Sequence, residues 1–169
     1  YAAPTPVQNA VLAEDAAGRD LLVSAQTGSG KTVAFGLAIA PELLGDAERL
    51  PPLGAPLAIV VAPTRELALQ VKAELTWLYA PAGGRIASGV GGMDPIGEKR
   101  QLLAGAHIIV GTPGRLCDHL ERGNLKPDAL RVVVLDEADE MLDLGFREEL
   151  EAILDRLPPE RRKIGRAHV

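Results

Sequence analysis

A lysine and a threonine close a glycine-rich stretch near the start of the chain, AQTGSGKT at residues 25–32. The apolar run at residues 20–24 predicts a strand before it, and residues 33–40 predict a helix after it. Glycines at such a turn let backbone N–H groups face an anion, and the helix N-terminus adds partial positive charge. Lys31 can then reach the β- and γ-phosphates of a nucleotide, and the Thr32 hydroxyl can bind Mg²⁺.

This stretch therefore predicts a nucleotide site. The alternative is an ordinary glycine turn before a helix. Gly-x-Gly-Lys-Thr after a buried strand argues against that alternative, although Ala25 stands where the strict phosphate-loop pattern has glycine. The nucleotide-binding residues that we predict here are Thr27, Gly28, Ser29, Gly30, Lys31 and Thr32.

An acidic pair follows a second apolar run, in the sequence VVVLDEAD at residues 132–139. Ligands of parallel α/β sheets bind at the carboxyl ends of the strands, which is where this pair is expected to lie. Asp136 is placed to hold Mg²⁺, and Glu137 is placed to orient and deprotonate the water that attacks the γ-phosphate. The alternative, an acidic helix cap, competes only if the pair is considered without Lys31 and Thr32.

The rest of the chain alternates between strand and helix patterns. Continuous apolar runs predict strands at residues 57–62, 85–90, 107–110 and 131–135. Helical spacing predicts helices at residues 4–17, 64–79, 94–104, 113–122, 137–142 and 146–157, and prolines and glycines predict a loop at 45–56. This alternation predicts an α/β fold with a mostly parallel sheet and helices on both faces.

The bulk composition limits the class of protein. The chain has 169 residues, one domain's worth, and its 47% hydrophobic and 3% aromatic content predicts an aliphatic core. The formal net charge of −5 excludes a global basic surface for nucleic acid, so such binding must depend on local arginines, lysines and backbone N–H groups. The single cysteine, Cys117, fits a reducing compartment, and we expect a cytoplasmic protein with no membrane segment.

Asp136-Glu137-Ala138-Asp139 resembles the motif that names the DEAD-box ATP-dependent RNA helicases, and the resemblance extends from Tyr1 to about Arg162. The sequence PTPVQ at residues 4–8 is similar to the core of the family's Q motif, which implies that Gln8 binds adenine and selects ATP. AQTGSGKT matches the family's phosphate loop, Ala25 included. The resemblance implies a three-layer, RecA-like P-loop NTPase domain that uses ATP and Mg²⁺.

Three further stretches resemble the family's RNA-contacting motifs: PTRELALQ at residues 63–70, Gly91-Gly92, and TPGR at residues 112–115. Hydroxyls, arginines and helix N-terminal amides at strand ends suit contacts to a sugar-phosphate backbone, which carry no base sequence. For each of these residues, a role as a helix cap or an ordinary loop residue agrees with the sequence as well as an RNA contact does. The RNA contacts that the resemblance implies are Thr64, Arg65, Gly92, Thr112 and Arg115, and Asp139 is expected to couple motifs within the domain.

The resemblance implies an ATP-dependent RNA helicase whose two domains close on ATP and single-stranded RNA and unwind a short duplex. The second RecA-like domain and the family's Ser-Ala-Thr motif are missing from these 169 residues, so we expect the chain alone to bind ATP weakly without unwinding. Two alternatives stay open: another helicase-like nucleic-acid translocase, and an RNA clamp or scaffold that uses ATP binding only.

Three features depart from the family pattern or carry no expected chemistry. Glu98 stands where many members have glutamine, and no mechanism follows from that. The tail at residues 163–169 shows no strand pattern, and IGRAHV is what a common sequencing adapter encodes in frame. We therefore expect the domain to span residues 1–162 and the tail to be non-native, from adapter read-through or a vector scar. His107, His119 and the Cys117 thiol are expected to have structural roles.

Overall fold

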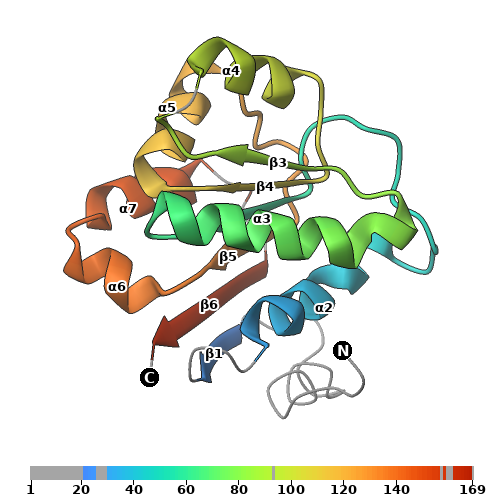
Figure 1. Cartoon of the computed structure of the whole chain (residues 1–169), viewed down its shortest axis with the longest axis horizontal. Helices are drawn as coiled ribbons and strands as arrows, with labels where there is room; N and C mark the ends of the chain where they lie inside the picture. Colours follow the sequence, from blue (N-terminus) through green and yellow to red (C-terminus); the bar gives the residue numbers. More distant parts are fainter. Residues whose placement is uncertain (1–20, 26–29, 93, 157, 159–161, 169) are drawn as a thin grey trace.

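Six parallel strands form the centre of the molecule. The structure, a computed structural model, describes residues 21–25, 30–92, 94–156, 158 and 162–168 (Figure 1). The strand order is β1-β6-β5-β2-β4-β3, and every neighbouring pair is parallel. The strands are β1 (Leu21–Ala25), β2 (Ala58–Val61), β3 (Ile86–Gly89), β4 (Ile108–Gly111), β5 (Val132–Leu135) and β6 (Arg162–His168).

Helices cover both faces of this sheet. In β2, Ala58 and Val60 pack into one apolar cluster with α2 and α3, whereas Ile59 and Val61 pack into a second cluster with α4, α5, α6 and α7. This alternation follows from the two-residue period of a strand. The helices are α2 (Lys31–Leu44), α3 (Arg65–Tyr79), α4 (Pro95–Leu103), α5 (Pro113–Arg122), α6 (Ala138–Asp143) and α7 (Arg147–Asp155), with a 3₁₀ turn, η2 (Ala80–Ala82), after α3.

The predicted three-layer α/β fold is thereby confirmed. Residues of β2, β4 and β5 are almost completely buried because both faces of the sheet are covered, which explains their continuous apolar runs. The predicted strands and helices lie within a few residues of the observed ones. The helix predicted at residues 4–17 lies outside the described residues. None of the described helices is both long and apolar enough to cross a membrane.

The helix that begins at Lys31 is fixed against the helix that begins at Arg65. The Tyr79 hydroxyl of α3 donates a buried 2.6 Å hydrogen bond to the carbonyl of Gly36 in α2. A Cβ atom at Gly36 would lie 2.6 Å from Cδ2 of Leu78, so glycine is what permits this close approach. The packing of α2 on α3 therefore sets the positions of two predicted site segments relative to each other.

The prediction that the tail lacks a strand was wrong. β6 pairs in parallel with β1 on one side and with β5 on the other, in registers such as Leu21 with Ile164 and Val134 with Ile164. A strand between two others gains hydrogen bonds from both neighbours, so tertiary context outweighs the weak strand preference of RKIGRAH. The tail thus contributes a central strand.

Candidate functional site

The predicted nucleotide site lies at the carboxyl ends of β1 and β5. Gly30 has φ 78°, a left-handed conformation that glycine adopts without strain, and α2 begins at the next residue. Lys31 and Thr32 of the first turn of α2 are 6% and 8% exposed. The other predicted nucleotide contacts, Gln8, Thr27, Gly28 and Ser29, lie outside the described residues.

The acidic pair follows β5 at the same edge of the sheet. Asp136 is fully buried, and its backbone N–H donates to the carbonyl of Val61 at 2.8 Å, which extends the β5–β2 ladder by one residue. Glu137 has φ 54° and is the non-glycine residue with positive φ in the described part of the chain. A left-handed residue with a Cβ costs roughly 1–2 kcal/mol, and such strain clusters at functional sites. The turn aims Glu137 back toward α2.

Lys31 and Glu137 meet across this turn. Lys31 Nζ lies 3.7 Å from Glu137 Oε1, and both side chains are at least nine-tenths buried. Among the described residues, Lys31 Nζ has no hydrogen-bond partner, although an ammonium carries three N–H donors. A buried cation in that state suits an anion such as a phosphate. The Thr32 hydroxyl and the Asp136 carboxylate are oxygen ligands of the kind that Mg²⁺ prefers.

The predicted RNA contacts follow the carboxyl ends of β2, β4 and β3, which are neighbours in the sheet. Thr64 is the N-cap of α3, where its hydroxyl accepts from the N–H of Leu67 at 3.2 Å, so the capping interpretation is correct for this residue. Arg65, next in the chain, is exposed. Thr112 occupies the N-cap position of α5 without a side-chain capping bond.

The glycine doublet lies between the two arginines of these segments. Gly91 and Gly92 have φ of 70° and 67°, so both need the left-handed conformation. A Cβ at Gly92 would lie 2.8 Å from Nη1 of Arg65, and one at Gly91 would lie 3.9 Å from Cδ of Arg115. The fold therefore brings together Arg65, the doublet and Arg115, three segments that are far apart in the sequence.

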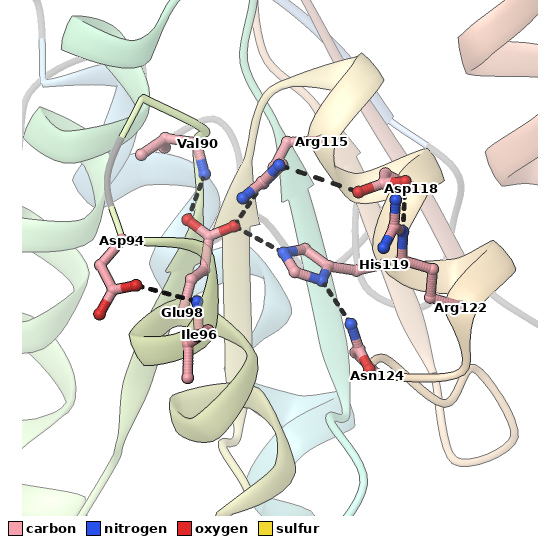
Figure 2. Close-up of polar contacts among 9 residues, drawn as sticks. All are labelled: Val90, Asp94, Ile96, Glu98, Arg115, Asp118, His119, Arg122 and Asn124. Atoms are coloured by element: carbon pink, nitrogen blue, oxygen red, sulfur yellow. Dashed lines mark hydrogen bonds and ion pairs between the residues drawn. The ribbon is translucent and has the colours of Figure 1, made fainter.

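Beneath this surface lies a polar network centred on Glu98 of α4 (Figure 2). Glu98 Oε2 accepts from the N–H of Val90 at 3.2 Å. Glu98 Oε1 accepts from Arg115 Nε at 2.7 Å and from His119 Nε2 at 2.5 Å. Asn124 Nδ2 lies 3.1 Å from His119 Nδ1. Glu98 and His119 are 7% and 2% exposed, so this is a buried network whose outer member is Arg115.

The donor and acceptor roles within the network follow from its contacts. An amide N–H of Asn124 faces His119 Nδ1, so that nitrogen accepts, and His119 Nε2 donates to Glu98. Burial alone would raise the pKa of Glu98. Hydrogen bonds from His119, Arg115 and Val90 outweigh burial and hold that pKa below its ordinary value. Glu98 is therefore a carboxylate at neutral pH.

No role for Glu98 follows from the sequence, and His119 is expected to be structural. The signal that could have found the network was the unusual glutamate itself, but its partners are 17 and 21 positions away and depend on how α4 packs beside α5. His107 bridges other segments: its Nδ1 accepts from the N–H of Arg85 at 2.9 Å and its Nε2 lies 2.7 Å from the carbonyl of Pro51.

Two further residues singled out from the sequence lie away from these contacts. Asp139 is exposed in the first turn of α6. Cys117 is partly buried on α5, where burial and then the carboxylate of Glu121 raise the pKa of its thiol. A thiol with a raised pKa stays protonated and is a poor nucleophile, in accord with a structural role.

Comparison with known proteins shows the family of this chain. The family model described as DEAD/DEAH box helicase matches residues 5–166, past Arg162 and into β6. The chain is 46% identical over 160 residues to DEAD-box ATP-dependent RNA helicase 9 of Oryza sativa subsp. japonica, covering 94% of this chain and 25% of that protein.

Two bacterial relatives give the same result. The DEAD-box ATP-dependent RNA helicase CshA of Geobacillus kaustophilus is 44% identical over 95% of this chain and 33% of its own length. The ATP-dependent RNA helicase DbpA of Bacillus subtilis is 43% identical over 95% of this chain and 32% of its own length. The chain thus spans a quarter to a third of the length of these relatives. It belongs to the DEAD/DEAH box helicase family.

Proposed function

We propose that this chain is the N-terminal RecA-like, ATP-binding domain of an ATP-dependent RNA helicase, which couples ATP hydrolysis to RNA binding and local duplex unwinding. One observation carries the proposal. The buried Lys31–Glu137 pair lies at the same edge of the sheet as the doublet and the two arginines that follow β2, β3 and β4. A phosphate site and a backbone-binding surface on one edge suit an enzyme that links the two ligands.

At the nucleotide site, Lys31 donates to the phosphates, and Thr32 and Asp136 would hold Mg²⁺, which would neutralise charge on the phosphate oxygens. When a phosphate binds Lys31, the Glu137 carboxylate loses its 3.7 Å contact with Lys31 Nζ. Glu137 then contacts the attacking water and accepts a proton from it. Gln8 selects adenine, and residues 27–30 cradle the phosphates with their backbone N–H groups.

At the RNA surface, Thr64, Arg65, Gly92, Thr112 and Arg115 contact the sugar-phosphate backbone without reading bases. This suits a chain with net charge −5, because the attraction comes from two arginines at one edge and not from the whole surface. Arg65 is exposed and the Arg115 side chain is 22% exposed, so both side chains reach solvent.

The full-length protein supplies a second RecA-like domain that completes both sites, and Asp139 couples the nucleotide motifs to the rest of the domain. The 169-residue chain alone binds ATP weakly and does not unwind RNA. A cytoplasmic location fits substrates of this kind.

The test is phosphate release by the full-length protein with single-stranded RNA or single-stranded DNA. We expect single-stranded RNA to stimulate phosphate release and single-stranded DNA not to stimulate it. Glu137→Gln should lower turnover by about 10²- to 10⁴-fold while ATP still binds, because it removes the proton acceptor. Glu140→Gln is the matched control, since Glu140 is an exposed glutamate of α6, the helix that begins just after Glu137.

Other outcomes favour the alternatives. Equal stimulation by DNA would indicate a translocase. Full biological activity in Glu137→Gln would indicate a clamp that needs ATP binding but no turnover.

A further inference from the structure

Two of the proposed RNA-facing segments are tied to one buried carboxylate. The N–H of Val90, the residue just before the glycine doublet, donates to Glu98 Oε2 at 3.2 Å. Nε of Arg115, on α5, donates to Glu98 Oε1 at 2.7 Å. The doublet and Arg115 follow different strands, β3 and β4, and Glu98 lies on a third element, α4. Glu98 therefore links two segments that backbone pairing alone does not fix.

The rest of the network holds Glu98 in place. His119 Nε2 lies 2.5 Å from the same oxygen that Arg115 contacts, and Asn124 fixes the His119 ring from its other nitrogen. All three groups around Glu98 are donors: a backbone N–H, a guanidinium N–H and an imidazole N–H. A carboxylate can satisfy all three because both of its oxygens only accept.

Glutamine, which has the same shape, cannot satisfy them all. If its amide oxygen faces Arg115 and His119, its NH₂ group faces the Val90 N–H, and the bond that holds the loop before the doublet is lost. If the oxygen faces Val90, the NH₂ group faces Arg115 Nε, and the arginine is released. In this second arrangement His119 can adapt by moving its proton to Nδ1, provided that the Asn124 amide turns its oxygen toward the ring.

We propose that Glu98 is a positioning residue that holds the Gly91–Gly92 loop and the Arg115 side chain in one arrangement, ready for an RNA backbone. The inference rests on the proposed function, because it takes Gly92 and Arg115 as RNA contacts. Arg115 keeps its outer face available: its side chain is 22% exposed and lines a groove of about 400 Å³ beside α4. Pre-ordering a flexible arginine in this way reduces the entropy lost on binding.

Electrostatics alone predicts the opposite effect of Glu98. A carboxylate beside Arg115 offsets its positive charge and weakens its attraction for phosphate. Asp118 Oδ2 acts in the same sense from 3.8 Å. Removing the charge of Glu98 therefore tightens RNA binding if the residue acts only through charge, and weakens it if the residue acts by positioning. The sign of the change separates these roles.

The experiment compares Glu98→Gln with Glu121→Gln in the full-length protein. Glu121 is an exposed glutamate on α5, so its substitution removes the same charge without touching the network. The readouts are the RNA concentration that gives half-maximal ATPase stimulation and kcat at saturating RNA. We expect Glu98→Gln to raise the half-saturating concentration about three- to tenfold, with kcat unchanged, because one charge-assisted hydrogen bond is lost.

Two additional measurements tie the effect to Arg115 and to the loop. In an Arg115→Ala background, Glu98→Gln should raise the half-saturating RNA concentration by a smaller factor than it does in the wild-type protein, since the two residues act through a shared contact. Long-range ¹H–¹⁵N spectra of the His119 ring report which nitrogen carries the proton. A shift to Nδ1–H in Glu98→Gln indicates that Arg115 was released, and an unchanged ring indicates that the Val90 loop was released.

Each outcome decides the matter. If Glu98→Gln binds RNA as tightly as Glu121→Gln or more tightly, the positioning role is wrong. A fall in kcat as large as the rise in the half-saturating RNA concentration would show a general structural defect instead of a positioning role. If RNA does not stimulate the wild-type protein and Arg115→Ala changes nothing, it is the proposed function that fails.

Discussion

The two buried ionic groups at this sheet edge are built in different ways. Lys31 and Glu137 approach only to 3.7 Å, and Lys31 Nζ has no hydrogen-bond partner in the described part of the chain. Glu98, in contrast, accepts three hydrogen bonds of 2.5 to 3.2 Å from two different segments. A long, loosely bonded pair can exchange partners at little cost, whereas a saturated network holds one geometry.

This difference matches what each region is proposed to do. The ion pair beside the phosphate loop must break, so that Lys31 can bind an incoming phosphate and Glu137 can contact the attacking water. The network beneath the doublet has no partner to exchange and serves to keep Arg115 and the loop in register. Backbone conformation agrees: Glu137 is held in a left-handed turn, a strain that its surroundings must sustain, while Glu98 lies in an ordinary helix.

The largest effect on folding should come from the saturated network. Glu98→Ala leaves the Val90 N–H, Arg115 and His119 without their acceptor, two of them in a buried setting. We expect the free energy of unfolding of this chain to fall by about 2–4 kcal/mol, as for a broken buried ion pair. Urea unfolding measures it, with exposed Glu121→Ala as the control, which should change stability by less than about 0.5 kcal/mol. Equal losses in both variants would show that the network is not saturated in solution.

A smaller effect, on binding and not on folding, should come from the loose pair. Lys31→Met keeps a long apolar side chain but removes the ammonium. The affinity of this chain for a fluorescent ATP analogue should fall about 10- to 100-fold, the range for losing a hydrogen bond between charged groups. The unfolding free energy should fall less than in Glu98→Ala, because a single 3.7 Å contact is removed. Lys126→Met, an exposed lysine in the loop before β5, is the matched control.

If Lys31→Met destabilises the fold more than Glu98→Ala does, the comparison of the two regions is reversed. Lys31 would then be a structural ion-pair partner first and a phosphate ligand second.

Much of this arrangement could be predicted from the sequence because the signals are local. Apolar runs gave β2, β4 and β5, and residues at their carboxyl ends were placed at one edge by the rule for parallel sheets. The strand β6 could not be predicted, since RKIGRAH has no strand pattern and is a strand because β1 and β5 lie on either side of it. Local preference is weak where both neighbours supply hydrogen bonds.

The residues of the candidate site also divide into those that the sequence predicts and those that it does not. Residue types and spacing predict the nucleotide-site residues, and the resemblance to the family implies the RNA-facing ones. Neither predicts the Glu98 network, because its members come from α4, from α5 and from the loop after α5. The meeting of Gly92 with Arg65 depends likewise on the strand order, which places β4 between β2 and β3. Long-range contacts of polar residues leave no periodic trace in a sequence, whereas burial of apolar residues does.

The smallest effect expected is a pH dependence that belongs to Glu98 alone. The groups that face its carboxylate are Arg115 and His119 of α5 and the Val90 amide, and together they lower its pKa below the ordinary 4.5. In the unfolded chain Glu98 titrates near that ordinary value, so between the two pKa values the unfolded state holds a proton that the folded state does not. The stability from Glu98 is therefore complete above pH 4.5 and is lost as the pH falls through the folded pKa.

Urea unfolding of the wild-type chain and of Glu98→Gln over a series of pH values measures this contribution, because the titrating groups outside the network are common to both. The wild-type advantage should stay constant from neutral pH to about pH 5 and shrink below it. An advantage that persists unchanged to about pH 3 would mean that Glu98 has no special acceptor role, since a protonated carboxyl would serve as well as a carboxylate. Arg115 would then be held by packing alone, and the distinction between a saturated network and a loose pair would lose its electrostatic basis.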